Sequence, residues 1–239
     1  MLIIRRKEHE RMNIFKSIKN LNRYELILWL TSVVMLTVAF IINPNKDLLN
    51  FIATLIGVTS LILNAKGDAL GQVLMVIFSI LYGIISFRFR YYGEMITYLG
   101  MTAPIAAISV ITWLKNPYGE REVKATHMNP KKWTILILCT IIVTWIFYYI
   151  LKFFDTPNIL FSTISITTSF LAAALTMLRS PYYATFYSLN DIVLIVLWVL
   201  ATFENPTYFT MIMCFAIFLV NDLYGFYSWK KMRKRQEQW

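Results

Sequence analysis

The sequence predicts an all-α integral membrane protein with eight transmembrane helices. The chain of 239 residues is 58% hydrophobic and only 15% charged, whereas a soluble domain is roughly a quarter charged. Its apolar residues also gather in runs close to the roughly 20 residues that a helix needs to cross about 30 Å of hydrocarbon. A soluble nucleic-acid-binding protein is therefore not expected, although the formal net charge is +10.

The apolar runs predict spans at 24–43, 48–65, 70–87, 94–114, 133–154, 159–178, 182–203 and 206–229. Several are separated only by short turns rich in Asn, Pro, Lys or Asp, as hairpin connections between helices are. The stretch 1–23 alternates basic and apolar residues and lacks the small-residue cleavage site of a signal peptide. It is expected to lie on the membrane surface as a cytoplasmic amphipathic segment.

The basic residues predict the orientation of the spans. All but four of the 23 lysines and arginines fall in the two termini and in alternate loops; the four are Lys46, Arg88, Arg90 and Lys152. Because cytoplasmic loops carry the excess of Lys and Arg, both termini are expected in the cytoplasm. The positive charge then contacts the anionic headgroups of the lipid bilayer rather than a nucleic acid.

The spans predict a parallel repeat of the form three, one and three, preceded by one extra helix. A basic residue, Lys66 or Arg179, opens the second helix of each triplet, and a Trp followed by Lys, Trp113 or Trp229, closes the third. A Trp beside a Lys is also the usual interfacial anchor, so this pattern has a second explanation. The expected segments are the N-terminal 1–23, the extra helix 24–47, a bundle 48–116, a basic loop and linker helix 117–158, a bundle 159–229 and a basic tail 230–239.

Polar side chains inside the spans are the candidate substrate site, because an ionisable one costs about 2.5 to 3.5 kcal/mol at the centre of a membrane helix. The candidates are Gln72, Tyr82, Glu94, Tyr183, Phe186, Tyr187, Asn190, Asp191 and Asn221. Those from Tyr183 to Asn190 recur at spacings of three and four and share a helix face, which suits a flat ring with hydrogen-bonding edges. The alternatives are aromatic packing and hydrogen bonds between helices.

Other residues have simpler readings. Glu25 begins the first span, where the helix dipole favours a carboxylate, and Pro104 predicts a kink inside the fourth span. The isolated Cys139 and Cys214 and the two histidines form no metal-binding pattern. No hydrolase, metalloprotease or nucleotide-binding motif is present. The sequence therefore predicts neither an enzyme nor an ATP-driven pump, and it requires no cofactor.

A set of short motifs resembles the PnuC family of bacterial vitamin transporters from about residue 48 to residue 229. They are Lys66-Gly67, Tyr82-Gly83, Tyr92-Gly93-Glu94-Met95, Pro104, Trp113 with Asn116, Glu122-Val123, and Asn221-x-x-Tyr224-Gly225 ending at Trp229. The resemblance implies a three-plus-one-plus-three fold with SWEET-like pseudo-symmetry, assembled as a homotrimer. It also implies facilitated diffusion of nicotinamide riboside for NAD biosynthesis, with a cytosolic kinase trapping the imported nucleoside. The implied location is the inner membrane of a bacterium.

The seventh span departs from the family pattern. The nicotinamide riboside branch carries Trp-x-x-Trp followed four residues later by Asn, and this chain has Tyr183-x-x-Phe186 followed by Asn190. Nicotinamide riboside remains the first expectation, with its ring on Tyr183 and Phe186. Hydrogen bonds are expected from Asn190, Asn221 and Gln72. The alternative substrates are another nucleoside, such as a deoxynucleoside, and the vitamins thiamine and riboflavin.

Overall fold

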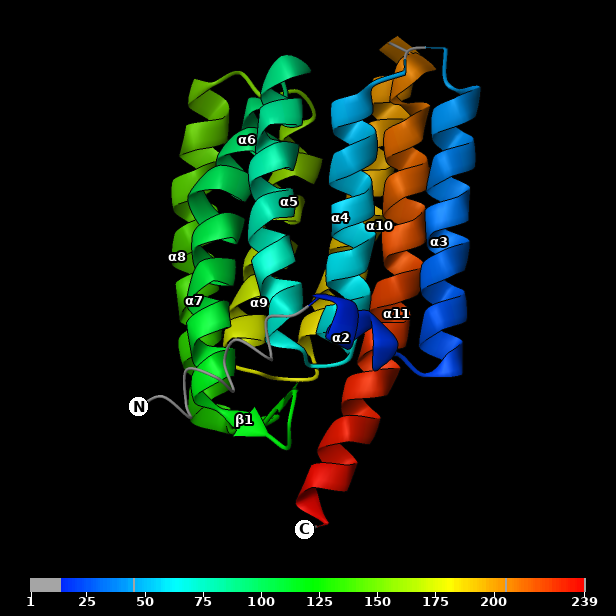
Figure 1. Cartoon of the computed structure of the whole chain (residues 1–239). Helices are drawn as coiled ribbons and strands as arrows, with labels where there is room; N and C mark the ends of the chain where they lie inside the picture. The colour runs from blue at the N-terminus through cyan, green and yellow to red at the C-terminus, as the bar shows by residue number, and fades with distance from the viewer. Residues whose placement is uncertain (1–13, 45, 205, 239) are drawn as a thin grey trace.

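Long helices that run side by side make up nearly all of the computed structural model, which describes residues 14–44, 46–204 and 206–238 (Figure 1). Within these residues eight helical segments are long and apolar enough to cross a membrane. This confirms the all-α membrane class and the eight predicted spans. The spans are α3 (Arg23–Ile42), α4 (Leu48–Ala65), α5 (Ala69–Arg88), the composite α6 (Tyr92–Thr97), η1 (Tyr98–Thr102) and α7 (Ala103–Lys115), α8 (Pro130–Phe153), α9 (Ile159–Met177), α10 (Tyr183–Glu204) and α11 (Phe209–Glu237).

The smaller elements lie at the ends of these spans. A short helix, α2 (Ile14–Lys19), precedes α3, and a 3-10 turn, η2 (Pro206–Tyr208), precedes α11. A two-stranded hairpin, β1 (Pro117–Tyr118) and β2 (Glu122–Val123), follows α7. Residues 1–13 of the predicted amphipathic segment lie outside the described residues. The helix α11 continues past the predicted end at 229, so most of the predicted tail is helical.

Side-chain caps explain where several helices begin. Asn22 forms a capping box with Glu25 at the start of α3, and Asp47 and Asp68 cap α4 and α5. Asn129 caps α8 directly before Pro130. These side-chain oxygens accept hydrogen bonds from backbone N–H groups that have no partner within the helix, so the short polar turns seen in the sequence are also the helix start signals.

The helices pack as two groups of three. In one group α5 contacts α4 and α7; in the other α10 contacts α9 and α11. The third helix of each group also packs on the first helix of the other, α7 on α9 and α11 on α4. Two groups related by a pseudo-two-fold axis would make contacts of this kind. The predicted parallel repeat is compatible with them and stays a prediction.

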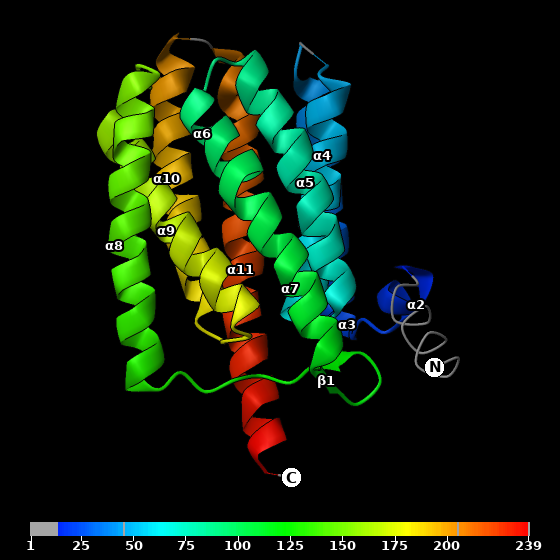
Figure 2. The ribbon, with the colours of Figure 1, turned by 90° about the vertical axis from the view of Figure 1, so that its left-hand side faces the viewer.

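Two spans stand outside the groups, at opposite edges of the bundle (Figures 1 and 2). The extra helix α3 packs on α4 and α11, and α8 packs on α9. In each of these two helices only 17% of the residues in an apolar stretch of 18 are buried, against 39% to 56% in the other six spans. The exposed faces of α3 and α8 are apolar, as surfaces in contact with lipid must be.

The fourth span contains the irregularity that Pro104 predicts, but it is a π-helical turn rather than a simple kink. Residues Tyr98–Thr102 form η1, and the N–H of Ala103 donates to the carbonyl of Tyr98, five residues back. Pro104 lies directly after it, in the first turn of α7. Proline has no N–H to continue an α-helical ladder, so the wider turn absorbs the break.

Both described ends of the chain lie at one end of the bundle, together with the hairpin (Figure 1). We call this end, where α4, α7 and α9 finish, the basic end, because the lysines and arginines of α2, the hairpin and the last turns of α11 lie there. Two ion pairs at this end join distant segments: Arg121 Nη1 lies 3.1 Å from Asp68 Oδ2, and Arg235 pairs with Glu122. The other end of the bundle is called the opposite end.

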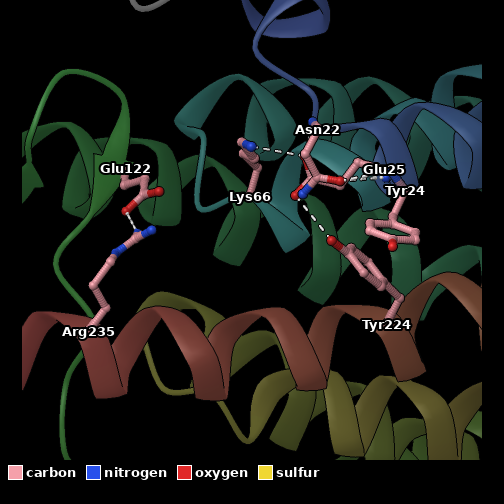
Figure 3. A network of polar contacts seen from close by, with 7 residues as sticks. All are labelled: Asn22, Tyr24, Glu25, Lys66, Glu122, Tyr224 and Arg235. Carbon is pink, nitrogen blue, oxygen red and sulfur yellow. Dashed lines mark hydrogen bonds and ion pairs between the residues drawn. The ribbon is translucent and has the colours of Figure 1, made fainter.

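The buried carboxylate of Glu25 connects α3 to neighbouring helices at the basic end (Figure 3). Glu25 Oε2 accepts hydrogen bonds from the backbone N–H of Asn22 at 2.7 Å and from Lys66 Nζ at 2.9 Å. Its Oε1 accepts one from the hydroxyl of Tyr224 at 3.1 Å. The carboxylate that the sequence assigned to the helix dipole therefore also links α3 to α4 and α11.

Candidate substrate site

A polar cluster lies between α6, α9 and α10, deep in the bundle. The Oδ1 atom of Asn190 accepts hydrogen bonds from the hydroxyls of Ser165 at 3.2 Å, Thr168 at 2.9 Å and Ser169 at 3.0 Å. The Ser165 hydroxyl is also 3.4 Å from Glu94 Oε1. The three hydroxyls recur at i, i+3 and i+4 on α9, so one face of that helix presents them together.

Several buried polar atoms near this cluster have no hydrogen-bond partner among the described residues. They include Glu94 Oε2 and Asp191 Oδ2, on side chains that are each only 3% exposed. An unsatisfied buried donor or acceptor costs about 1 to 3 kcal/mol, and more if it is charged. Such atoms are the positions where a bound ligand or ordered water is expected.

A second carboxyl group lies against Asp191. The side chains of Asp191 on α10 and Asp222 on α11 are in hydrogen-bonding contact. The phenol of Tyr98 on η1 lies within electrostatic range of Glu94, Asp191 and Tyr187. The acidic groups of three helices therefore face one interior region, and η1 carries an aromatic ring to it.

An aromatic layer covers this region toward the opposite end. The Tyr82 ring lies 4.3 Å from that of Tyr98, and the Tyr82 hydroxyl accepts a hydrogen bond from Trp198 Nε1 at 3.1 Å. Trp198 in turn packs against Tyr91 and Tyr208, with ring centroids 4.9 and 5.6 Å away. These rings join α5, the fourth span, α10 and η2 on the side of Asn190 that faces the opposite end.

A second aromatic layer covers it toward the basic end. The rings of Trp113 and Trp229 lie 5.3 Å apart, and Tyr183 lies 5.0 Å from Trp229. Trp113 Nε1 donates to the carbonyl of Thr176 at 2.9 Å, and Trp229 Nε1 donates to that of Asn64 at 2.7 Å. Each indole thus bonds the end of the first helix of the other group, and the polar cluster is enclosed between two aromatic layers.

The structure brings together only part of the predicted site. Glu94, Asn190 and Asp191 meet in the interior, with Tyr82 and Tyr187 beside them. Gln72 Nε2 instead donates to Asn64 Oδ1 at 2.8 Å, and Asn221 Nδ2 donates to Ser32 Oγ on α3 at 3.1 Å. Both amides lie apart from the Asn190 cluster.

The two rings of the predicted aromatic pair, Tyr183 and Phe186, lie in one hydrophobic cluster but make no ring contact with each other among the described residues. Tyr183 is 1% exposed and belongs to the layer at the basic end, in edge contact with Tyr187 at 6.1 Å. Phe186 is half-buried and packs at the margin of the same hydrophobic cluster. Stacking of the substrate ring on the face formed by Tyr183 and Phe186 therefore stays a prediction.

Sequence reasoning missed five residues of this site. They are Ser165, Thr168 and Ser169 on α9, Trp198 on α10 and Asp222 on α11. The signal for the first three was present as Ser and Thr at helical spacing in an apolar span. Asp222 is an ionisable residue inside the predicted last span, but its place near the cytoplasmic surface favoured a solvated side chain. Only the packing of α10 shows that it is buried.

A many-spanning helical bundle that encloses a polar site between two aromatic layers has the features of a membrane transporter of small molecules. The comparisons agree with this class. The sequence model of the family described as nicotinamide mononucleotide transporter matches residues 47–231. The chain belongs to this family, which is one of transporters and not of enzymes, and the resemblance to the PnuC proteins is confirmed.

Two curated relatives are named nicotinamide riboside transporter PnuC. The protein of Neisseria mucosa is 26% identical over 204 residues, which cover 83% of this chain and 77% of the relative. The protein of Haemophilus influenzae is 25% identical over 212 residues, covering 87% and 91%. A crystal structure described as the vitamin B3 transporter PnuC superimposes with a TM-score of 0.82 over 92% of this chain and 97% of that one. At 23% identity it shows the shared fold.

Proposed function

We propose that this protein imports nicotinamide riboside across the bacterial inner membrane by facilitated diffusion. The observation that carries the proposal is the enclosed cluster of Glu94, Ser165 and Asn190, whose unpaired polar atoms match a ligand with several hydrogen-bonding groups. Both curated relatives are named for this substrate. The chain carries no nucleotide-hydrolysing motif, so uptake runs down the nucleoside gradient and a cytosolic kinase maintains that gradient by phosphorylation.

The candidate residues take different roles in this proposal. Glu94, Asn190 and Asp191 bind polar groups of the substrate, and Tyr82 and Tyr187 lie beside them. Tyr183 and Phe186 offer ring faces once the layer at the basic end opens. Gln72 Nε2 and Asn221 Nδ2 donate to Asn64 and Ser32, while Asn221 Oδ1 has no partner among the described residues and is free to accept a hydrogen bond from a ligand.

The basic end is the cytoplasmic end in this proposal, because positive loops are retained inside. An impermeant thiol reagent tests it on intact cells, in a variant whose two native cysteines are replaced. A cysteine at Lys46 or Lys152 should react, and one at Lys124 or Lys234 should react only after the cells are lysed. The reverse pattern would place the termini outside.

The proposed homotrimer is tested by chemical cross-linking in membranes. The largest cross-linked product should have three times the mass of the monomer.

One observation favours the alternative that another vitamin or nucleoside is carried. The family's Trp-x-x-Trp is replaced by Tyr183-x-x-Phe186, and smaller rings supply less stacking area. Purified protein should be titrated with nicotinamide riboside, thiamine, riboflavin and a deoxynucleoside. The proposal expects nicotinamide riboside to bind most tightly, and a tighter competitor would replace it.

Transport itself is tested in liposomes that contain only this protein. Labelled nicotinamide riboside should enter until its concentrations inside and outside are equal, with no proton or sodium gradient imposed. If an imposed ion gradient drives accumulation above the external concentration, facilitated diffusion is wrong and the buried carboxyl groups become candidates for ion coupling.

A further inference from the structure

The interior site is acidic and has no basic partner among the described residues. Glu94, Asp191 and Asp222 are each 3% exposed. None of the three takes part in an ion pair with another described residue. The described lysines and arginines all lie at helix ends or in connecting segments. Buried carboxyl groups without a cation are costly in a low-dielectric interior. A positively charged ligand would supply the missing partner.

Glu94 is the carboxyl group best placed to face a ligand. The side chains of Asp191 and Asp222 lie against each other, although Asp191 Oδ2 has no hydrogen-bond partner among the described residues. Glu94 instead interacts with Ser165, which donates to its Oε1, and its Oε2 is without a partner. A separate observation marks the same place as a ligand site. Asn190, 2% exposed, uses Oδ1 for three hydroxyls, while its Nδ2 donates no hydrogen bond to the described residues.

The substrates under consideration divide by charge. The pyridinium ring of nicotinamide riboside and the thiazolium ring of thiamine each carry a permanent positive charge, whereas riboflavin and the deoxynucleosides are neutral. Opposite charges attract far more strongly in a buried site than in water. A single acidic side chain beside the ring can therefore separate these two classes.

We propose that Glu94 is the counter-ion of a cationic ring and selects a charged substrate over a neutral one of the same shape. This inference rests on the proposed transport of nicotinamide riboside and deepens it. The Ser165 hydroxyl lies against one carboxylate oxygen, and the other is left for the ligand.

The test compares nicotinamide riboside with its dihydro form, in which the ring has gained a hydride and lost its charge. Glu94→Gln keeps the shape of the side chain and removes its negative charge. Binding of the cationic riboside to this variant should weaken by about tenfold or more, as expected for the loss of a buried charge partner. Binding of the neutral dihydro form should stay within about twofold, which also reports that the variant is folded.

Ser165→Ala is the matched control, because it removes a hydroxyl at the same place and leaves the charge. Whatever its absolute affinity, this variant should keep the wild-type preference for the cationic form. If Glu94→Gln weakens both forms equally, or weakens neither, Glu94 is not a counter-ion and the proposal is overturned.

Failure of the proposed substrate would look different. If the wild-type protein binds neither form of the riboside, the transport proposal is wrong. Binding of thiamine, which is cationic, is then compared with binding of riboflavin, which is neutral. Binding of thiamine that Glu94→Gln weakens would support the counter-ion with another substrate. A wild-type protein that binds only the neutral ligand would refute it.

Discussion

Asn190 holds the centre of the site because its amide oxygen accepts hydrogen bonds from three α9 hydroxyls. Asn190→Ala should weaken nicotinamide riboside binding by about 1 to 3 kcal/mol, the cost of leaving buried polar groups unsatisfied. Calorimetric titration of the purified variant measures this, with uptake into liposomes as a second readout. Wild-type affinity at unchanged expression would show that Asn190 does not contact the substrate.

The sequence located the polar residues but could not pair them. Asn190 and Asn221 look alike in the sequence, each an Asn followed by Asp in an apolar span. One lies among the hydroxyls of α9, while the other bonds Ser32 of α3, 189 residues away in the chain. Helical periodicity gives the face on which a residue lies, and only the packing of the other helices decides what that face meets.

At the scale of single elements, the Glu25 network joins three helices at one point. Glu25→Gln should lower the free energy of unfolding by roughly 2 to 4 kcal/mol, because it leaves Lys66 next to a neutral amide and weakens the capping box. Thermal unfolding in detergent measures the loss. The Glu25→Gln/Lys66→Met double variant should be less destabilised than Glu25→Gln alone. A larger loss in the double variant would show that the two side chains act independently.

The start of α3 illustrates what the sequence could predict about an element. The cap is local, since Asn22 and Glu25 are three residues apart, and the carboxylate was expected at the helix start. Its other partners, Lys66 and Tyr224, are 41 and 199 residues away. No short-range pattern predicts such contacts, so the role of Glu25 in attaching α3 appears only in the fold.

The π-helical turn η1 sets the direction of Glu94 and Tyr98 relative to α7. Pro104→Ala restores an N–H at the break and should allow a regular α-helix. The π-helical turn holds about one residue more than an α-helical turn, so its loss would rotate the residues before it by roughly 100° about the helix axis. Riboside binding should weaken by about tenfold, while stability is kept or rises. Unchanged binding, measured by titration, would mean that the turn is held by packing and not by Pro104.

For the whole molecule, hydropathy predicted eight spans because each must satisfy its backbone within one helix and face lipid or other helices. The grouping of these spans needed tertiary contacts. The third helix of each group packs on the first helix of the other, and Trp113 and Trp229 make equivalent hydrogen bonds across that boundary. The Trp residues that the sequence could assign equally to an interfacial anchor are buried at 1% and 0% exposure, so they hold the groups together.

These two hydrogen bonds should stabilise the closed state of the bundle at the basic end. Trp113→Phe or Trp229→Phe keeps an aromatic ring but removes the donor, at a cost of about 1 kcal/mol, so the closed state loses roughly fivefold in population against an open one. Ala184 is fully buried in the same cluster. With the native cysteines replaced by alanine, an Ala184→Cys thiol should therefore react about fivefold faster in either variant.

Trp133→Phe is the control, because Trp133 lies at the same end and packs on Tyr182 without a hydrogen bond from its indole N–H to the described residues. Its labelling rate should match that of the parent. Trp113 and Trp229 should give similar increases, since each bonds the first helix of the other group. Faster labelling in only one of the two variants would mean that the two hydrogen bonds do not stabilise the closed basic end equally. The three-plus-one-plus-three repeat would then describe the order of the helices but not the way in which the basic end opens.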